Sequence, residues 1–231
     1  MNTVRFYGHT PPVAGDEPTL GRLIVVEGTD GVGRSTQIAM LQEWLEAEGY
    51  AVLVTGLRRS ELASSGIDRA MRGNTLDALT LNLFYATDFW DRLEKSIIPA
   101  MRSGMVALID RYIYSIIARA RVRGVPPRWL NDVFEFAVVP DRVLFLDVDV
   151  EHLLPRVLAV RQLDHWESGD DFLGGTDLYE NFIRYQSALI DEFRELAKEH
   201  NFVTVDARGS VSEVFQALQA EVREAVKGMG E

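Results

Sequence analysis

The segment that decides the fold is Leu23–Thr36, which reads LIVVEGTDGVGRST. Its first four residues are apolar and mostly β-branched, which predicts a buried strand, and the residues from about Ser35 to Ala47 predict a helix. The glycine-rich turn between them fits the pattern G-x-x-x-x-G-K-[ST] at every position except Arg34, where the pattern has lysine. A strand, such a turn and a helix in this order are typical of a loop that holds phosphate.

This turn predicts the binding site for the phosphates of ATP. Its glycines let the backbone approach a phosphate closely, and the N–H groups at the start of the helix point toward it. The hydroxyl of Ser35 is a ligand for the Mg²⁺ that accompanies ATP, and Arg34 keeps the positive charge of lysine on a larger planar group. The alternative is a strand-to-helix turn that binds nothing. The predicted ATP-binding residues are Gly28, Gly31, Val32, Gly33, Arg34, Ser35 and Thr36.

The rest of the chain predicts four more strands with helices between them. The strands are expected at residues 51–55, 106–109, 143–146 and 202–205. The clearest helices are expected at residues 76–101, with an interruption near Pro99, and at residues 178–199 and 211–226. Because the strand segments are continuously apolar, they suit a parallel sheet buried on both faces. The alternation predicts a doubly wound α/β fold, in which ligands bind at the carboxyl ends of the strands.

Length and composition predict one globular domain. A chain of 231 residues, 47% of them apolar and 26% charged, is expected to bury one sizeable core. Residues 1–20 contain several glycines and prolines and predict a flexible leader, and residues 21–231 predict the domain. The segment Gly169–Thr176, which is rich in glycine and aspartate, predicts a mobile loop between helices.

Charge and cysteine content exclude several classes of function. The 24 Lys and Arg residues against 35 Asp and Glu residues give a net charge of −11, which disfavours polynucleotides and anionic membranes. The absence of cysteine excludes disulfides, thiolate metal sites and cysteine nucleophiles. No apolar stretch approaches the roughly 20 residues that span a bilayer, and the N-terminus does not resemble a signal peptide. We therefore expect a cytoplasmic protein with neither a polynucleotide nor a membrane as partner.

Motifs along the chain resemble the thymidylate kinase family over about residues 22–225. Residues 27–37 (EGTDGVGRSTQ) look like the family's E-G-x-D-G-x-G-K-S-T-Q, residues 110–112 (DRY) match its D-R-Y/H, and residues 140–148 (PDRVLFLDV) resemble its P-D-x-x-L-x-L-D-V. The resemblance implies a P-loop NTPase fold with a five-stranded parallel sheet, helices on both faces and a small lid at about residues 156–177. It also implies ATP-dependent phosphorylation of a nucleoside monophosphate, dTMP above all, with Mg²⁺ and in a homodimer.

The same resemblance assigns roles to individual residues. It implies that Asp30 contacts the sugar of the acceptor nucleotide, although an aspartate that caps a turn is the alternative. It implies that Asp110 holds hydrated Mg²⁺ and that Arg111 pairs with the acceptor phosphate, with a structural ion pair as the alternative. Arg58 and Arg59 are the counterparts of an arginine near the second strand that binds the acceptor phosphate. The predicted acceptor-binding residues are Asp30, Arg58, Arg59, Tyr85, Phe89, Arg111, Tyr112 and Arg119.

Besides Arg34, and besides residues 118–121 (ARAR), which stand where many relatives have A-Y-Q-G, two segments depart from the family pattern. Residues 85–89 (YATDF) stand where the family has F-A-A-D-R, so Tyr85 keeps an aromatic face for stacking but Phe89 replaces the arginine that reads the base. Loss of that hydrogen bond, worth about 1–3 kcal/mol, is enough to change base choice. Arg119 is the candidate to replace it from the opposite side.

The second departure lies in the lid. Residues 163–167 (LDHWE) stand where the family has D-R-x-E, so that His165 replaces arginine. Arg156 and Arg161 flank this segment, and either supplies charge to the transition state or is an ordinary solvated residue. The predicted catalytic residues are Arg34, Asp110, Arg111 and Arg161, and the predicted Mg²⁺ ligands are Ser35 and Asp110.

Three hypotheses for function follow from these residues. The leading one is a kinase of dTMP, the second is a kinase of the same fold for another nucleotide, and the third is a nucleotide-binding protein with lost or weak transfer. The altered Arg34, Phe89 and His165 favour the third, and the intact pair of Asp110 and Arg111 favours an enzyme. The apolar helix at residues 76–90 is the candidate for a dimer interface, or is ordinary core.

Overall fold

The computed structural model describes residues 4–8, 19–73, 76–174 and 177–229. All five predicted strands are present, and they form one parallel sheet in the order β2-β3-β1-β4-β5. The strand bounds are β1 (Arg22–Glu27), β2 (Val52–Gly56), β3 (Val106–Asp110), β4 (Arg142–Asp147) and β5 (Val203–Asp206). Strand β1 lies at the centre of the sheet, with β3 and then β2 on one side and β4 and then β5 on the other. The carboxyl end of β1 therefore lies where a doubly wound sheet binds its ligands.

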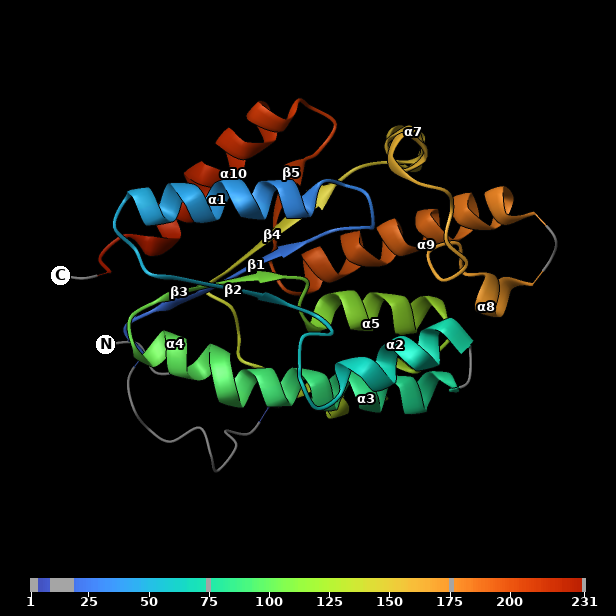
Figure 1. The fold of residues 1–231 in the computed structure, drawn as a ribbon, viewed down its shortest axis with the longest axis horizontal. Coiled ribbons are helices and arrows are strands. Elements are labelled where there is room, and N and C mark those ends of the chain that lie inside the picture. Colours follow the sequence, from blue (N-terminus) through green and yellow to red (C-terminus); the bar gives the residue numbers. More distant parts are fainter. Residues whose placement is uncertain (1–3, 9–18, 74–75, 175–176, 230–231) are drawn as a thin grey trace.

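Helices cover both faces of the sheet, as predicted. On one side lie α1 (Arg34–Ala47) and α10 (Val211–Val226), and on the other lie α3 (Ala78–Arg92), α4 (Ile98–Arg102) and α5 (Ile113–Val122), as Figure 1 shows. The remaining helices are α2 (Ser64–Gly73), α6 (Pro127–Phe134), α7 (Val150–Val160), α8 (Asp170–Leu173) and α9 (Leu178–Glu199).

The alternation of side chains along β1 explains this layering. Leu23 and Val25 point into the core on the side of α3, α5 and α9, whereas Ile24 and Val26 point into the core on the side of α1 and α10. All four side chains are fully buried. Successive side chains of a strand face opposite ways, so an apolar run of this kind requires cover on both faces and supports a three-layer α/β arrangement.

Two local features differ from the sequence-based expectations. The predicted break near Pro99 is instead a π-helical turn, η2 (Leu93–Ile97), that joins α3 to α4 without interrupting the helical path. Pro99 lies in the first turn of α4, where a missing N–H is tolerated. The predicted mobile loop at residues 169–176 contains the short helix α8, and residues 175 and 176 lie outside the described part.

Part of the predicted leader lies against the domain. Phe6 forms an antiparallel bridge with Val138, and the backbone N–H of Tyr7 donates to the carbonyl of Ala137 at 3.0 Å. The Tyr7 ring packs edge-on against His200, with 5.4 Å between ring centroids. Residues 4–8 are thus anchored rather than free, whereas residues 1–3 and 9–18 lie outside the described part. No helix of the described segments is long and apolar enough to cross a membrane.

Candidate active site

The loop after β1 has the backbone shape that its glycines predict. Gly28, Gly31 and Gly33 have φ values of 146°, 82° and 103°, which side chains rarely adopt. A Cβ atom at position 31 would also stand 2.5 Å from the Cγ2 atom of Val157. Helix α1 begins immediately after Gly33, and the hydroxyl-bearing residues of its first turn are exposed. The positive end of this helix is thereby open to a phosphate.

Arg34 turns back into this loop. Its side chain is 7% exposed, and its Nη1 atom donates to the carbonyl of Gly28 at 2.5 Å and to the carbonyl of Thr29. Its Nε atom donates to the Asp110 carboxylate at 2.8 Å. The guanidinium therefore links the phosphate loop to the end of β3, and its charge is already paired in the free chain.

A buried carboxylate at the end of β1 positions the turn after β3. Glu27 is fully buried and accepts hydrogen bonds from the backbone N–H groups of Tyr112 at 2.8 Å and Ser115 at 3.2 Å, and from the Ser115 hydroxyl at 2.6 Å. Burial raises the pKa of Glu27, although these donors oppose the change. Glu27 thus caps helix α5 from a neighbouring strand and fixes Arg111, whose φ of 69° is unusual for a residue with a side chain.

Asp30 joins two arginines across the site. The Nη2 atom of Arg111 donates to one oxygen of its carboxylate, and the Nη2 atom of Arg119 donates to the other at 2.6 Å. Although burial opposes the change, these two cations lower the pKa of Asp30 far below the ordinary value. Burial and then the like charge of Arg34 lower the pKa of Arg111 to about 9, so its guanidinium stays charged at neutral pH. Asp30 raises the pKa of Arg119 against the effect of burial.

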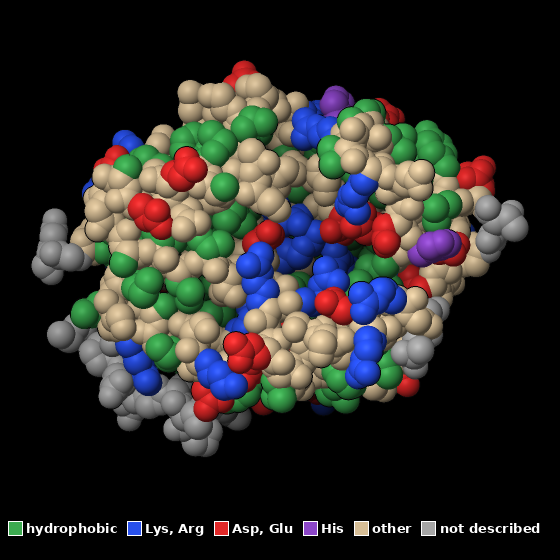
Figure 2. Space-filling view, viewed as in Figure 1, with side chains coloured by type: hydrophobic (Ala, Val, Ile, Leu, Met, Phe, Trp, Pro, Cys, Tyr) green, Lys and Arg blue, Asp and Glu red, His purple; other side chains and the backbone are tan. Residues whose placement is uncertain are grey.

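Asp30 and Arg119 line two adjoining cavities at the carboxyl edge of the sheet. The first, of about 200 Å³, is bounded by Arg58, Arg59, Tyr85, Asp110, Arg111 and Arg119, with Asp30 between them. The second, of about 510 Å³, extends from Asp30 and Arg119 to Arg161, His165 and Glu167. Figure 2 shows basic side chains gathered around a hollow near the centre of this face, with acidic side chains between them. A strongly acidic chain therefore keeps a local concentration of cations where the phosphate loop opens.

Comparison with known proteins identifies the family. The sequence model of the thymidylate kinase family matches residues 26–218. The chain belongs to the thymidylate kinase family. It is 37% identical over 196 residues to "Probable thymidylate kinase 2" of Saccharolobus solfataricus, covering 84% of this chain and 92% of that protein. It is 29% identical over 220 residues to "Probable thymidylate kinase" of Pyrococcus abyssi, covering 90% and 99%. It is 30% identical over 220 residues to "Thymidylate kinase" of Caldicellulosiruptor saccharolyticus, covering 90% and 98%.

Within this member of the thymidylate kinase family, the structure brings most predicted acceptor residues to one cavity but leaves two in the core. Phe89 is fully buried and packs edge-on against Tyr112, with 4.8 Å between ring centroids. The Tyr112 hydroxyl donates to the carbonyl of Val138 at 2.7 Å. Neither residue lines the cavities described above. Position 89, to which the resemblance assigns the reading of the base, is therefore occupied by a core side chain, and the backbone N–H of Tyr112, next to Arg111, donates to Glu27.

A narrow slot next to Tyr85 contains polar atoms that the sequence did not single out. It is lined by Tyr85, Asn82, Ile116, Arg123 and Trp166, with a volume of about 20 Å³. Asn82 donates to the carbonyl of Ala78 at 2.7 Å, but its Oδ1 atom is buried and has no hydrogen-bond partner among the described residues. The Nε1 atom of Trp166 is also buried and has no hydrogen-bond partner among the described residues. Asn82 lies three residues before Tyr85, so helical spacing was the available signal.

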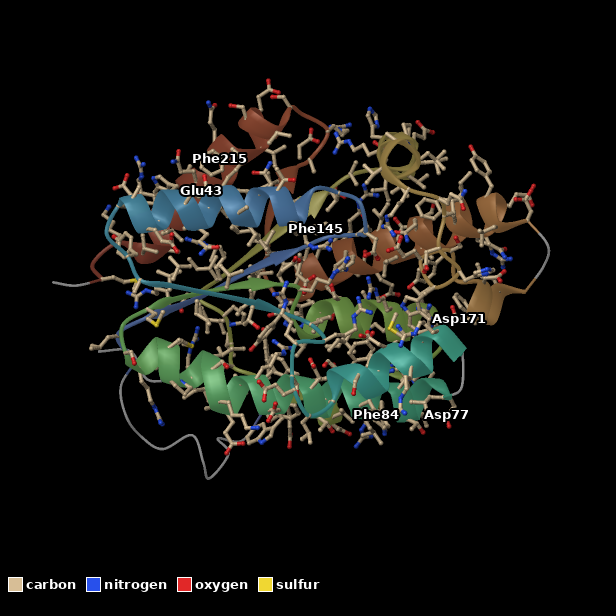
Figure 3. All side chains as sticks on the ribbon, in the orientation of Figure 1. Glu43, Asp77, Phe84, Phe145, Asp171 and Phe215 are labelled. Carbon is tan, nitrogen blue, oxygen red and sulfur yellow. The ribbon has the colours of Figure 1, made fainter. Side chains whose placement is uncertain are left out.

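The lid segment after α7 is held to α5 through Arg123. This guanidinium donates to both oxygens of the Asp171 carboxylate at 2.8 Å and lies 4.1 Å from the centre of the Trp166 ring. Asp171, labelled in Figure 3, belongs to α8. Arg161 pairs with Glu167 at 2.6 Å at the edge of the larger cavity, and this pairing raises the pKa of Arg161.

The other two residues considered in the lid, His165 and Arg156, are paired with groups of the protein itself. His165 is 82% exposed and pairs with Asp170 at 2.9 Å. Arg156 donates to the carbonyl of Ala207 at 2.7 Å and to that of Arg208 at 3.1 Å. Arg156 thus ties α7 to the loop between β5 and α10, and of the two flanking arginines only Arg161 reaches the cavity.

The two residues predicted to hold Mg²⁺, Ser35 and Asp110, offer a hydroxyl and a carboxylate. Ser35 is exposed at the start of α1, and the Asp110 side chain is 22% exposed at the end of β3. No group of three or more His, Cys, Asp or Glu side chains that could hold a metal occurs in the described ranges. Kinases hold Mg²⁺ through one or two protein ligands, water and the phosphates of the nucleotide. Ser35 and Asp110 fit that mode of binding.

Proposed function

We propose that this protein transfers the γ-phosphoryl group of ATP to dTMP, giving ADP and dTDP. The observation that carries the proposal is the joining of two anion-binding elements through Asp30. This residue lies in the phosphate loop shortly before the start of α1, and its carboxylate holds Arg111 and Arg119, which line the cavity of about 200 Å³ together with Arg58 and Arg59. Two phosphate groups repel one another, so a phosphotransferase needs fixed positive charge on both before they meet.

In the proposed reaction, an oxygen of the dTMP phosphate forms the new bond to the γ-phosphorus of ATP. The bond from that phosphorus to the bridging oxygen breaks, and the electron pair leaves with ADP. Because the attacking phosphate is already ionised, no general base is required, and catalysis rests on alignment and charge. Mg²⁺, held by Ser35 and Asp110, would neutralise charge on the donor phosphates. Arg34, Arg111 and Arg161 are the cations proposed to stabilise charge during transfer.

The acceptor is proposed to occupy the two adjoining cavities and the slot behind them. Arg58, Arg59 and Arg111 bind its phosphate, Asp30 contacts its sugar, and the face of Tyr85 stacks on its base. The unpartnered Oδ1 atom of Asn82 is proposed to accept a hydrogen bond from the base edge, since a buried acceptor is costly to leave unpaired. The slot of about 20 Å³ has to widen for this, and movement of the lid that carries Trp166 provides the route.

An assay of ADP release against a panel of nucleoside monophosphates tests the proposal. We expect turnover with dTMP to exceed turnover with the other monophosphates. Preferred turnover with another acceptor would favour the second hypothesis, a kinase of the same fold for a different nucleotide. Silence with every acceptor, together with tight ATP binding in calorimetry, would favour the third. The pairing of Arg34 with its own loop is the observation that keeps this third candidate in view.

We also propose a cytoplasmic homodimer. The outer face of α3 exposes Leu79, Leu83 and Phe84 by 47%, 50% and 38%, and Leu62 nearby is 70% exposed. Figure 3 shows Phe84 on the outer helical layer, away from the sheet. An apolar patch on an outer helix is typical of a protein interface. Light scattering should give twice the monomer mass, and Leu83→Glu should shift it toward the monomer. The cytoplasmic location rests on the requirement for ATP.

A further inference from the structure

The turn at residues 57–60 carries two arginines to the acceptor cavity in a strained conformation. It follows β2 directly, and both Arg58 and Arg59 line the cavity of about 200 Å³. Arg58 has a φ of 59°, in the left-handed region. A residue with a Cβ atom adopts this region only when its surroundings hold it there. The turn therefore needs a partner that fixes its backbone.

Asp88 supplies that partner from the middle of α3. Its carboxylate is completely buried. One oxygen accepts from the backbone N–H of Arg58 at 3.1 Å, and the other accepts from the backbone N–H of Ser60 at 3.0 Å. One helical turn later, the Nε atom of Arg92 donates to the same carboxylate at 3.1 Å. The two N–H groups of the turn are thereby held by one rigid group on a packed helix.

The buried ion pair of Asp88 and Arg92 is not explained by its contribution to folding stability alone. A buried ion pair repays its desolvation only when its hydrogen bonds are complete, and well-packed apolar residues often serve a core as well or better. Here the Nη1 and Nη2 atoms of Arg92 are buried without a hydrogen-bond partner in the described part of the chain. The Asp88 carboxylate, by contrast, is fully engaged, and two of its three bonds go to the turn that bears the arginines.

We propose that Asp88 is a positioning residue for the acceptor: it holds the turn at residues 57–60 so that Arg58 and Arg59 face the acceptor phosphate. Arg92 supplies the counter-charge that lets this carboxylate stay buried. The inference rests on the proposed function for the identity of the acceptor, but the bracing of the turn stands on its own geometry. A change confined to Asp88 therefore acts on acceptor binding without touching the phosphate loop.

Two variants and one control test the brace without any assay of activity. Asp88→Asn keeps the shape of the side chain but cannot accept from both N–H groups at once. The double variant Asp88→Asn with Arg92→Gln also removes the unpaired cation, so it separates loss of the brace from charge imbalance. We expect amide hydrogen exchange across residues 57–60 to quicken by about tenfold or more in both. The control, Asp77→Asn, changes the N-cap of the same helix and should leave exchange in the turn unchanged.

Kinetics then test the coupling of the brace to the acceptor. In both Asp88 variants, KM for dTMP should rise by about tenfold, while KM for ATP and kcat change by less than about threefold. The proposal is overturned if the turn exchanges at the wild-type rate in Asp88→Asn, or if the double variant recovers both the exchange rate and KM. Faster exchange with an unchanged KM for dTMP would refute the link to the acceptor. If the wild type shows no turnover with any monophosphate, the proposed function is wrong. Amide hydrogen exchange across residues 57–60 then still tests whether Asp88 holds the turn.

Discussion

Replacing Asp30 by asparagine should destabilise the free protein and make its stability depend on phosphate. The Asp30 carboxylate is 14% exposed and pairs with Arg111 and Arg119, which are 12% and 14% exposed. Asparagine keeps one acceptor oxygen but no charge. Both guanidiniums would then lie close to each other and to Arg34 with less negative charge between them, which is the usual penalty for breaking a buried pair on one side.

The magnitude follows from the two hydrogen bonds that the substitution weakens. Charge-assisted hydrogen bonds in such a partly buried site contribute about 1–2 kcal/mol each, so weakening both costs about 2–4 kcal/mol. A domain of this size loses about 2–4 °C in Tm per kcal/mol, which gives a fall of about 4–16 °C. We expect inorganic phosphate to bind between the two arginines in the native state only and so to restore part of the lost stability.

Thermal unfolding of the wild type and Asp30→Asn, with and without inorganic phosphate at constant ionic strength, measures both effects. The matched control is Glu195→Gln, because Glu195 pairs with Lys198 on the surface, away from the cavities, where both side chains are more than half exposed. That pair contributes little, and its Tm should move by less than about 2 °C. A Tm for Asp30→Asn equal to that of the wild type, or an equal response of both proteins to phosphate, would refute the role given to Asp30.

Three further predictions concern the phosphate loop, the acceptor and pH. Arg34→Lys should preserve or raise kcat and retain ATP binding, since lysine fits the family pattern; loss of ATP binding in calorimetry would contradict the loop assignment. Arg111→Ala should raise KM for dTMP by about tenfold more than KM for ATP, and steady-state kinetics showing equal increases would contradict it. Burial raises the folded-state pKa of Glu27 above 4.5. Its contribution to the free energy of unfolding is therefore complete below pH 4.5 and is lost as pH rises through the raised value. Urea unfolding should therefore show the wild type losing stability relative to Glu27→Gln above pH 4.5, and the reverse slope would mean that the hydrogen bonds to Glu27 outweigh its burial.

The long helices and the sheet could be predicted from sequence because their signals are local. The bounds expected for α9 and α10, residues 178–199 and 211–226, agree with the structure. Each has an apolar stripe and a side-chain cap: Asp177 accepts from the first turn of α9, and Ser210 forms a capping box with Glu213 at the start of α10. Such features depend on residues only a few positions apart.

The features that sequence missed depend on contacts between distant residues. The anchoring of residues 4–8 joins Tyr7 to partners more than one hundred positions away, and no periodicity in the leader announces it. Glu27 was part of the quoted motif, yet its capping of α5 becomes visible only when β1 and β3 lie side by side. The π-helical turn at residues 93–97 likewise has no clear signal in the sequence.

The candidate acceptor site also combines residues that a local motif can predict with residues whose orientation depends on packing. Tyr85 and Phe89 are four residues apart on one helix, so a motif treats both as lining the site, but only Tyr85 reaches a cavity. Which of two neighbouring positions faces a ligand is set by the packing of the helix, here against Tyr112. Arg119 lines both cavities, and its role in binding the acceptor stays a prediction.

The charge of the free site is partly neutralised by its own acids, and this limits what a ligand gains on binding. Arg34 pairs with Asp110, and Arg111 and Arg119 pair with Asp30, so these three cations have carboxylate partners before any phosphate arrives. An incoming phosphate exchanges one anion for another, and its net gain is smaller than a sum over its new hydrogen bonds suggests. Affinity then depends on geometry, because a phosphate offers each guanidinium more oxygens than a shared carboxylate does. The chain has a net charge of −11, so its surface and its phosphate-bearing substrates are both negative. The paired carboxylates hold the arginines of the site together until such a substrate binds.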